Sequence, residues 1–253
     1  MKQTINFDYV ADIYDYYVST DFDINFFINE TRNVNGEILE LMCGTGRAST
    51  PLLKAGRKMV CVDYSAGMLD VFRKKISDMN YNVELINMDV TELKLNRKFD
   101  FIFLPFHSLS EIISKELQIK ALVKISEHMN KDGIFICTLQ NPLIRLKTAD
   151  GTLRILGKFD LSENRNMIIS YINQYDENTK LVSGFQFYEI FDGNKKLIEK
   201  RFLEINFKPV FYNEFSEMIK EAGMEIVNIY GDYEYSDFDE SKSDFMIYKL
   251  INK

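Results

Sequence analysis

The stretch Ile38-Leu39-Glu40-Leu41-Met42-Cys43-Gly44-Thr45-Gly46-Arg47 decides the fold of this chain. Its apolar residues predict a buried strand, which leads through an acid into a tight turn. The glycines at 44 and 46 permit a left-handed backbone and the close approach of a ligand. Pro51 is tolerated only in the first turn of a helix, so we expect a helix to begin near Ser49 or Thr50. The turn then lies at the positive end of that helix, where backbone N–H groups are free.

A second apolar strand, Met59–Val62, ends in Asp63. An acid at this point can accept hydrogen bonds from both hydroxyls of a ribose. The spacing fits the fingerprint of a dinucleotide-binding fold, although Ser49 stands where the third glycine is expected. Because such a fingerprint is weak on its own, an NAD-dependent oxidoreductase remains open as one interpretation.

Glu40 argues against a dinucleotide. We expect its carboxylate beneath the glycine turn, close to where a pyrophosphate would lie, and like charges repel at that distance. S-adenosylmethionine has no phosphate and carries a sulfonium and an α-ammonium, which an acid would attract. The pattern therefore favours S-adenosylmethionine. The alternative is that Glu40 and Asp63 are simply solvated acids at strand ends.

Several motifs in order resemble those of the class I S-adenosylmethionine-dependent methyltransferases of the small-molecule type. The resemblance extends from about residue 9 to residue 250. One departure is Met42, where many members of the family have glycine. The matching segments, in order, are Ile38–Arg47, Val60–Leu69, Asn87–Val90, Phe99–His107 and Lys131–Ile136.

This resemblance implies S-adenosylmethionine as the cofactor and assigns residues to its parts. Glu40 is implied to hold the methionine amine, Asp63 the ribose hydroxyls and Asp89 the adenine amino group. Backbone groups at Gly44, Gly46 and Leu104 are implied to complete the site. The further cofactor contacts that it implies are Tyr9, Tyr64, Met68 and Val90, and it implies no metal.

The pattern along the chain predicts an α/β fold, a doubly wound, Rossmann-like, mostly parallel sheet with an antiparallel insertion. Residues 1–35 are aromatic and acidic, and we expect two short helices there that form an N-terminal lid. Strands and amphipathic helices then alternate through residues 36–150, and this domain resumes at 210–253. Residues 151–209 lack helical periodicity and alternate with a period of two, which predicts three or four antiparallel strands. The insertion follows the fifth strand, so we expect it to cover the acceptor site; an ordinary appendage or a dimer surface is the alternative.

Methyl transfer asks the protein mainly to align the reactants and exclude water. If a base is needed, His107 is our first candidate, because it follows the fourth strand and imidazole titrates in a useful range. A structural histidine is the alternative, and His128 is expected to be a helix-terminus residue. Tyr14 and Tyr17, with Tyr9, resemble lid tyrosines that close over the cofactor and acceptor, although simple packing of the N-terminal helix would also account for them.

Composition narrows the partners. The net charge of −7 counts against broad binding of nucleic acid or of an anionic membrane. Cys43, Cys61 and Cys137 have neither disulfide nor zinc-ligand spacing and are expected to be reduced and buried. We found no segment apolar enough to be a signal peptide or a membrane span, so we expect a cytoplasmic protein.

The sequence does not identify the acceptor. It lacks the Asn/Asp-Pro-Pro-Tyr signature and the Pro-Cys nucleophile of nucleobase methylation, so we expect transfer to nitrogen or oxygen of a small molecule. Two further interpretations stay open: a non-catalytic S-adenosylmethionine-binding protein, and a methyltransferase that acts on a protein or tRNA. The oligomeric state is expected to be a monomer or homodimer.

Overall fold

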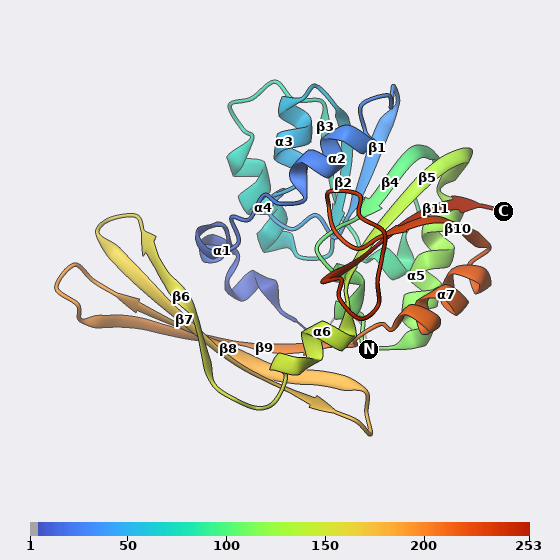
Figure 1. The fold of residues 1–253 in the computed structure, drawn as a ribbon. Helices are drawn as coiled ribbons and strands as arrows, with labels where there is room; N and C mark the ends of the chain where they lie inside the picture. The colour runs from blue at the N-terminus through green and yellow to red at the C-terminus, as the bar shows by residue number, and fades with distance from the viewer. Residues whose placement is uncertain (1–4) are drawn as a thin grey trace.

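A computed structural model, which describes residues 5–253, contains a seven-stranded sheet in the order β10-β11-β5-β4-β1-β2-β3 (Figure 1). The strands β5, β4, β1, β2 and β3 are parallel, and β11 runs antiparallel to both β5 and β10. This arrangement confirms the predicted mostly parallel, Rossmann-like sheet. Its strands are β1 (Glu37–Leu41), β2 (Lys58–Asp63), β3 (Val83–Asn87), β4 (Phe99–Leu104), β5 (Met129–Gln140), β10 (Met224–Tyr230) and β11 (Phe245–Asn252).

Helices cover both faces of this sheet. The side chains of β4 alternate between two apolar cores, with Ile102 in one and Phe103 in the other. The first core includes Leu122 of α5 and Phe215 of α7, and the second includes residues of α2, α3 and α4. The helices are α1 (Ala11–Tyr17), α2 (Ile24–Glu30), α3 (Ser49–Lys54), α4 (Ala66–Lys75), α5 (Lys115–Glu127), α6 (Pro142–Arg145) and α7 (Tyr212–Glu221), with 3₁₀ segments at Phe7–Tyr9, Val90–Glu92, Ser108–Glu111 and Leu146–Thr148.

The helix boundaries follow local chemistry. Ser65 and Ser114 cap α4 and α5, because their hydroxyls accept hydrogen bonds from the N–H groups of Met68 and Leu117. Gly56 follows α3 with φ +80°, as expected for a helix C-terminus. The apolar face of α5 does not extend to Met129. That residue begins β5 instead, because a buried apolar residue fits the end of a helix and the start of a strand equally well.

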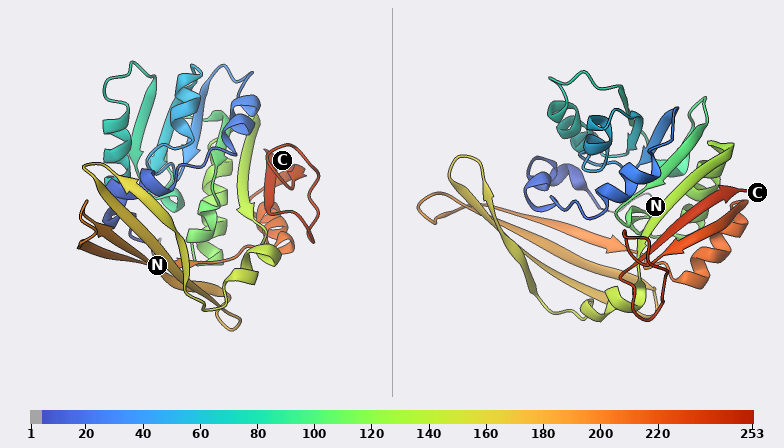
Figure 2. Two further views of the ribbon diagram at one scale, coloured as in Figure 1. Left: turned by 60° about the vertical axis from the view of Figure 1, so that its left-hand side comes forward. Right: turned by 45° about the horizontal axis from the view of Figure 1, so that its top comes forward.

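A separate antiparallel sheet is formed by β6 (Arg154–Leu161), β7 (Arg165–Asp176), β8 (Leu181–Phe191) and β9 (Leu197–Phe207). Tight turns join β7 to β8 and β8 to β9. Asp176 accepts hydrogen bonds from two N–H groups in the β7–β8 turn, and Asp192 does the same in the β8–β9 turn. Figures 1 and 2 show this sheet as a layer of its own across one end of the parallel sheet, with α1 between them.

The N-terminal segment joins the two sheets. Val10 and Ile13 pack in a third apolar core with Met167 and Tyr188 of the antiparallel sheet. An ion pair between Arg201 of β9 and Asp12 of α1, at 2.6 Å, adds a polar link. Three cysteines are buried and free, as expected. Within residues 5–253, no helix is both long enough and apolar enough to cross a membrane.

Candidate active site

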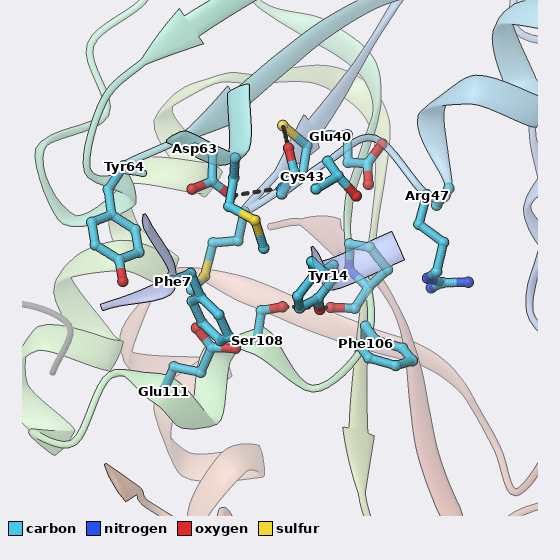
Figure 3. Close-up of a pocket in the computed structure, with 16 residues that line it drawn as sticks. Phe7, Tyr14, Glu40, Cys43, Arg47, Asp63, Tyr64, Phe106, Ser108 and Glu111 are labelled. Carbon is cyan, nitrogen blue, oxygen red and sulfur yellow. Dashed lines mark hydrogen bonds between the residues drawn. The ribbon is translucent and has the colours of Figure 1, made fainter. Parts of the chain in front are cut away.

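Two adjoining cavities lie at the carboxyl ends of β1, β2 and β4. The first, which we call the cofactor cavity, is lined by residues from the glycine turn, the end of β2 and the segment after β4, with the N-terminal segment across it (Figure 3). Carboxyl ends of parallel strands are where open α/β sheets bind ligands. The labelled side chains around it are Phe7, Tyr14, Glu40, Cys43, Arg47, Asp63, Tyr64, Phe106, Ser108 and Glu111.

Glu40 lines the cofactor cavity from β1, at the position expected beneath the glycine turn. It is buried and accepts a hydrogen bond from the hydroxyl of Ser49, the first residue of α3. Burial raises the pKa of Glu40 to about 8, and the bond from Ser49 opposes that rise only in part. A buried carboxyl of this kind is stabilised in its ionised form by a cationic ligand.

Asp63 holds the glycine turn in place. Its Oδ2 accepts a hydrogen bond from the N–H of Gly44 at 2.7 Å, and its Oδ1 accepts one from Ser65 at 2.8 Å. Burial raises the pKa of Asp63 to about 6, although these two backbone donors favour the ionised form. Each oxygen keeps a further lone pair, so the carboxylate can still accept hydrogen bonds from a diol.

The turn itself takes a left-handed conformation at several residues. Gly44 has φ +55°, and Met42 has the same value, so methionine adopts the backbone conformation for which glycine is better suited. Gly46 has φ +76° but does not line the cavity. A Cβ at Gly46 would lie 2.4 Å from atoms of the Phe72 ring, so this position requires glycine for packing against α4.

Arg47 supplies the positive charge of the cofactor cavity, and the sequence analysis assigned it no role. Its guanidinium forms two hydrogen bonds of 2.6 Å with the fully buried Asp23 and a third with the carbonyl of Thr20. It also lies 4.5 Å from the centroid of the Phe106 ring. Asp23 therefore holds the Arg47 guanidinium in place and offsets part of its charge.

The N-terminal segment closes over the glycine turn. Asp15 of α1 accepts a hydrogen bond from the hydroxyl of Thr45 at 2.6 Å and pairs with Lys75 at 2.5 Å. Asp8 accepts hydrogen bonds from Ser65 and Gly67 at the start of α4. As a result the cofactor cavity is narrow, about 50 Å³. We therefore expect this segment to move outward when a nucleoside enters.

The second cavity, which we call the acceptor cavity, has a volume of about 410 Å³, within the range of small-molecule sites. Its walls come from three parts of the chain: the N-terminal segment, the carboxyl end of the parallel sheet and the antiparallel insertion. The hydroxyls of Tyr17 and Tyr188 share a hydrogen bond of 3.0 Å, and the Tyr188 hydroxyl lies 2.6 Å from Oε1 of Gln186, to which it donates. The lining residues used below are Tyr14, Tyr17, His107, Glu111, Arg145 and Asn173.

His107 lines the acceptor cavity, and its ring is buried between two aromatic side chains. Its ring stacks on Phe245 at 5.7 Å and on Phe106 at 5.6 Å. Burial, together with the charges of Arg145 and Arg47, lowers the pKa of His107 to about 3, which is below the range in which an imidazole ordinarily titrates. Phe106 and His107 have φ +58° and +64°, a conformation that costs energy for residues other than glycine.

Glu111 lines both cavities, and the sequence analysis missed it. It ends the 3₁₀ segment after β4, where no periodicity draws attention to a single acid. Burial and the nearby charge of Asp63 raise the pKa of Glu111 to about 8. Glu111 therefore lies where the two cavities adjoin, with a pKa in the range of a candidate proton acceptor.

The structure brings most of the predicted residues to these cavities. Tyr14, Glu40, Gly44, Asp63, Tyr64 and Met68 line the cofactor cavity, and Tyr14, Tyr17 and His107 line the acceptor cavity. Five predicted cofactor contacts lie outside this set. Tyr9 is 62% exposed and lies at a separate hollow beside β9. Asp89 caps the 3₁₀ segment that begins at Val90, Leu104 is buried in the core, and Gly46 packs against Phe72.

His128 is a helix-terminus residue, as expected, because it ends α5 and its Nδ1 lies 2.7 Å from the carbonyl of Lys124. Among residues 5–253, no cluster of three or more His, Cys, Asp or Glu side chains is arranged to hold a metal ion.

Residues 38–133 match the methyltransferase domain family. Among curated proteins, a cypemycin N-terminal methyltransferase from Streptomyces sp is 29% identical over 117 residues, which cover 46% of this chain and 47% of that protein. The chain thus spans about half the length of this relative.

Solved structures share the whole fold. The CcbJ methyltransferase from Streptomyces caelestis has a TM-score of 0.82 at 22% identity, and the match covers 100% of this chain and 99% of that one. An S-adenosylmethionine-dependent methyltransferase from Clostridium acetobutylicum ATCC 824 has a TM-score of 0.80 at 22% identity, covering 96% and 97%. Residues 38–133 thus match a methyltransferase domain, and the chain as a whole shares the fold of S-adenosylmethionine-dependent methyltransferases.

Proposed function

We propose that this protein transfers the methyl group of S-adenosylmethionine to a nitrogen atom of a small-molecule amine. The observation that carries the proposal is the charge of the cofactor cavity. Three carboxyl groups line it, from Glu40, Asp63 and Glu111, against one guanidinium that is already paired with Asp23. Such a site favours a cationic ligand and disfavours a diphosphate, which counts against the NAD-dependent alternative.

The residues of the cofactor cavity fit the parts of S-adenosylmethionine. In our proposal, Glu40 holds the α-ammonium, Arg47 the α-carboxylate and Asp63 the ribose hydroxyls, with the N–H groups of the glycine turn nearby. Asp89 and Val90 are proposed to reach the adenine from the start of the 3₁₀ segment after β3. Tyr14 and Phe7 cover the site and exclude water.

The acceptor cavity adjoins this site and has the size of a small metabolite. We propose that the antiparallel insertion and the N-terminal segment form its roof, because Gln186 and Tyr17 from these two parts line it together. The cypemycin relative is named for transfer to an N-terminus, which also suits an amine. The cavity volume of about 410 Å³ also suits a small molecule better than a protein or tRNA acceptor.

Glu111 suits an amine better than a neutral hydroxyl. Its carboxylate attracts an ammonium group and can take one proton from it, which frees the nitrogen lone pair. S-adenosylmethionine supplies a methyl group on a positively charged sulfur, which makes that carbon electrophilic. The amine nitrogen then forms the new C–N bond while the C–S bond breaks and its electron pair stays on sulfur. Tyr14 and Tyr17 position the amine in this arrangement, and His107 packs beside it as a neutral ring.

The test is an untargeted screen of a metabolite extract with S-adenosylmethionine labelled in its methyl group. We expect label in a small amine, whereas label only in protein or tRNA would contradict the proposal. With the acceptor in hand, Glu111→Gln should lower turnover about 100-fold and cofactor affinity much less, because Glu40 and Asp63 remain in the cofactor cavity. Glu221→Gln, at an exposed acid on α7, is the matched control.

A further inference from the structure

Unpaired polar atoms gather at the acceptor cavity. Among the described residues, seven buried side-chain nitrogen or oxygen atoms have no hydrogen-bond partner. Three of them belong to residues that line this cavity: Nδ1 of His107, Nε of Arg145 and Oδ1 of Asn173. Buried polar groups in proteins are nearly always paired, so such a cluster at a cavity indicates a polar ligand.

Arg145 is the most informative of the three. It ends α6, directly after β5, and its guanidinium makes no ion pair with any acid among residues 5–253. Its only hydrogen bond within that part of the chain is from Nη1 to the hydroxyl of Thr148, at 3.1 Å, and its charge lies 5.6 Å from the centroid of the Phe207 ring. Burial lowers the pKa of Arg145, which reflects a cation without a compensating anion.

The other arginines near the site differ in this respect. Arg47 is paired with Asp23, and Arg201 is paired with Asp12 and Glu199. A guanidinium presents five donors in a planar fork that matches the two oxygens of a carboxylate or a phosphate. Arg145 lines the acceptor cavity but not the cofactor cavity, so its partner belongs to the acceptor.

We propose that the methyl acceptor carries an anionic oxygen group, a carboxylate or a phosphate, which Arg145 binds in the acceptor cavity. This inference rests on the proposed function, because it names the class of amine that the same site takes. The amine lies toward Glu111, at the junction with the cofactor cavity, and the anionic group lies toward α6 and Phe207. Asn173 of β7 is free to accept a hydrogen bond from a hydroxyl or N–H group of the same molecule.

The test compares two probes of equal shape on protein saturated with S-adenosylhomocysteine, so that Arg47 is covered. Phenylacetate carries the carboxylate, and phenylacetamide is its neutral counterpart. Calorimetry of the wild-type protein should give at least about ten-fold tighter binding of phenylacetate, as expected for charge-assisted hydrogen bonds. Equal binding of the two probes, or no binding of either, would overturn the proposal. Phenyl phosphate, tested alongside, distinguishes a phosphate from a carboxylate site by binding more tightly or less tightly than phenylacetate.

Variants locate the effect. Arg145→Met should abolish the preference for phenylacetate, and Arg145→Lys should retain part of it, whereas Lys147→Met, at an exposed cation two residues away, should behave as wild type. A preference that survives in Arg145→Met would contradict the assignment. If Arg145→Met does not fold, the difference in affinity between phenylacetate and phenylacetamide for the wild-type protein still tests the proposal.

A second readout uses the only two histidines of the chain, whose ring signals are separable by NMR. Phenylacetate should shift the ring signals of His107, because the charge of Arg145 acts on that ring. The ring signals of His128 should not shift, because both of its ring nitrogens are hydrogen-bonded within the protein. Unchanged His107 signals would place the probe elsewhere. The proposed function fails separately, if S-adenosylhomocysteine does not bind or if no amine is methylated.

Discussion

Asp63 accepts a hydrogen bond from the backbone N–H of Gly44 at 2.7 Å, so the acid at the end of β2 holds the turn that follows β1. The residue that we propose to bind the ribose thus also shapes the part of the backbone that we propose to face the methionine. Changes at Asp63 should therefore affect both the cofactor and the turn.

Asp63→Ala should weaken binding of S-adenosylhomocysteine by about 100-fold, because it removes acceptors for two hydroxyls and releases Gly44. Turnover at saturating cofactor should fall much less. Calorimetry and steady-state kinetics measure the two effects, with Asp70→Ala on the exposed face of α4 as the control. A variant that loses turnover but not affinity would rule out this role.

Glu40 should make both stability and cofactor affinity depend on pH. Its raised pKa, about 8, means that the folded protein keeps a proton which the unfolded chain has already lost. The free energy of unfolding should therefore fall as the pH rises from about 5 to about 8, by up to about 1.4 kcal/mol per pH unit for this group. Urea unfolding of Glu40→Gln should show a shallower fall, with Glu111 responsible for part of the remainder.

Glu40 should make cofactor affinity change with pH in the opposite direction to stability. A cationic ligand stabilises the ionised form of Glu40, so S-adenosylmethionine should bind more tightly as the pH rises from 5.5 to 7.5, by up to about ten-fold per pH unit for each proton displaced. The dependence of the binding enthalpy on the ionisation enthalpy of the buffer gives the number of protons released on binding. The same pH slope of affinity in Glu40→Gln would show that another group is responsible.

Gly46→Ala tests the packing role of the second glycine. The new Cβ would lie 2.4 Å from the Phe72 ring, and the left-handed backbone adds strain, so we expect a loss of about 2–4 kcal/mol in the free energy of unfolding. Gly56→Ala is the matched control, because φ is also positive there but a Cβ meets nothing within 4 Å. That variant should lose only about 1–2 kcal/mol. Equal losses in the two variants would mean that packing against Phe72 contributes nothing.

Asp15→Ala should speed cofactor association. Asp15 ties α1 to the glycine turn through Thr45 and Lys75, and the narrow cofactor cavity must open before a nucleoside can enter. Stopped-flow measurement with S-adenosylhomocysteine should show an association rate several-fold higher, with Asp21→Ala, at an exposed position in the same segment, unchanged. A slower association rate in Asp15→Ala would contradict this, because it would mean that the closed N-terminal segment assists association.

The pH profile of the wild-type reaction should show no inflection near pH 6.5, and His107→Ala should not change the shape of the profile in that range. The ring is neutral throughout the working range because its pKa is about 3, so the profile should instead follow Glu111, with activity rising as the pH approaches about 8. Loss of stacking on Phe245 should still lower turnover to some extent. If wild type showed an inflection near pH 6.5 that vanished in His107→Ala, the original role of His107 as a titrating base would be restored.

The parallel sheet and the glycine turn were predictable because they depend on local patterns. Glu40 and Asp63 end consecutive parallel strands, and that topology alone brings them to one edge of the sheet. The antiparallel strands of the insertion were predictable in the same way, from the alternation of residues 151–209 with a period of two.

The acceptor cavity was not predictable, because its walls depend on how distant segments fold back. Glu111, Arg145 and Asn173 come from a 3₁₀ segment, the end of a short helix and an inserted strand, and no spacing in the sequence connects them. The pKa of His107 depends on burial and on two arginines from elsewhere in the chain. The aromatic N-terminal segment likewise predicted three lid tyrosines, but only the tertiary structure shows that Tyr14 and Tyr17 line cavities while Tyr9 is largely exposed.

Calorimetric titration of the wild-type protein with S-adenosylmethionine and, separately, with NAD⁺ tests most directly whether the acidic cavity selects a cation. We predict micromolar or tighter binding of S-adenosylmethionine that weakens in Glu40→Gln, and no measurable binding of NAD⁺. Tight binding of NAD⁺ with none of S-adenosylmethionine would contradict the account.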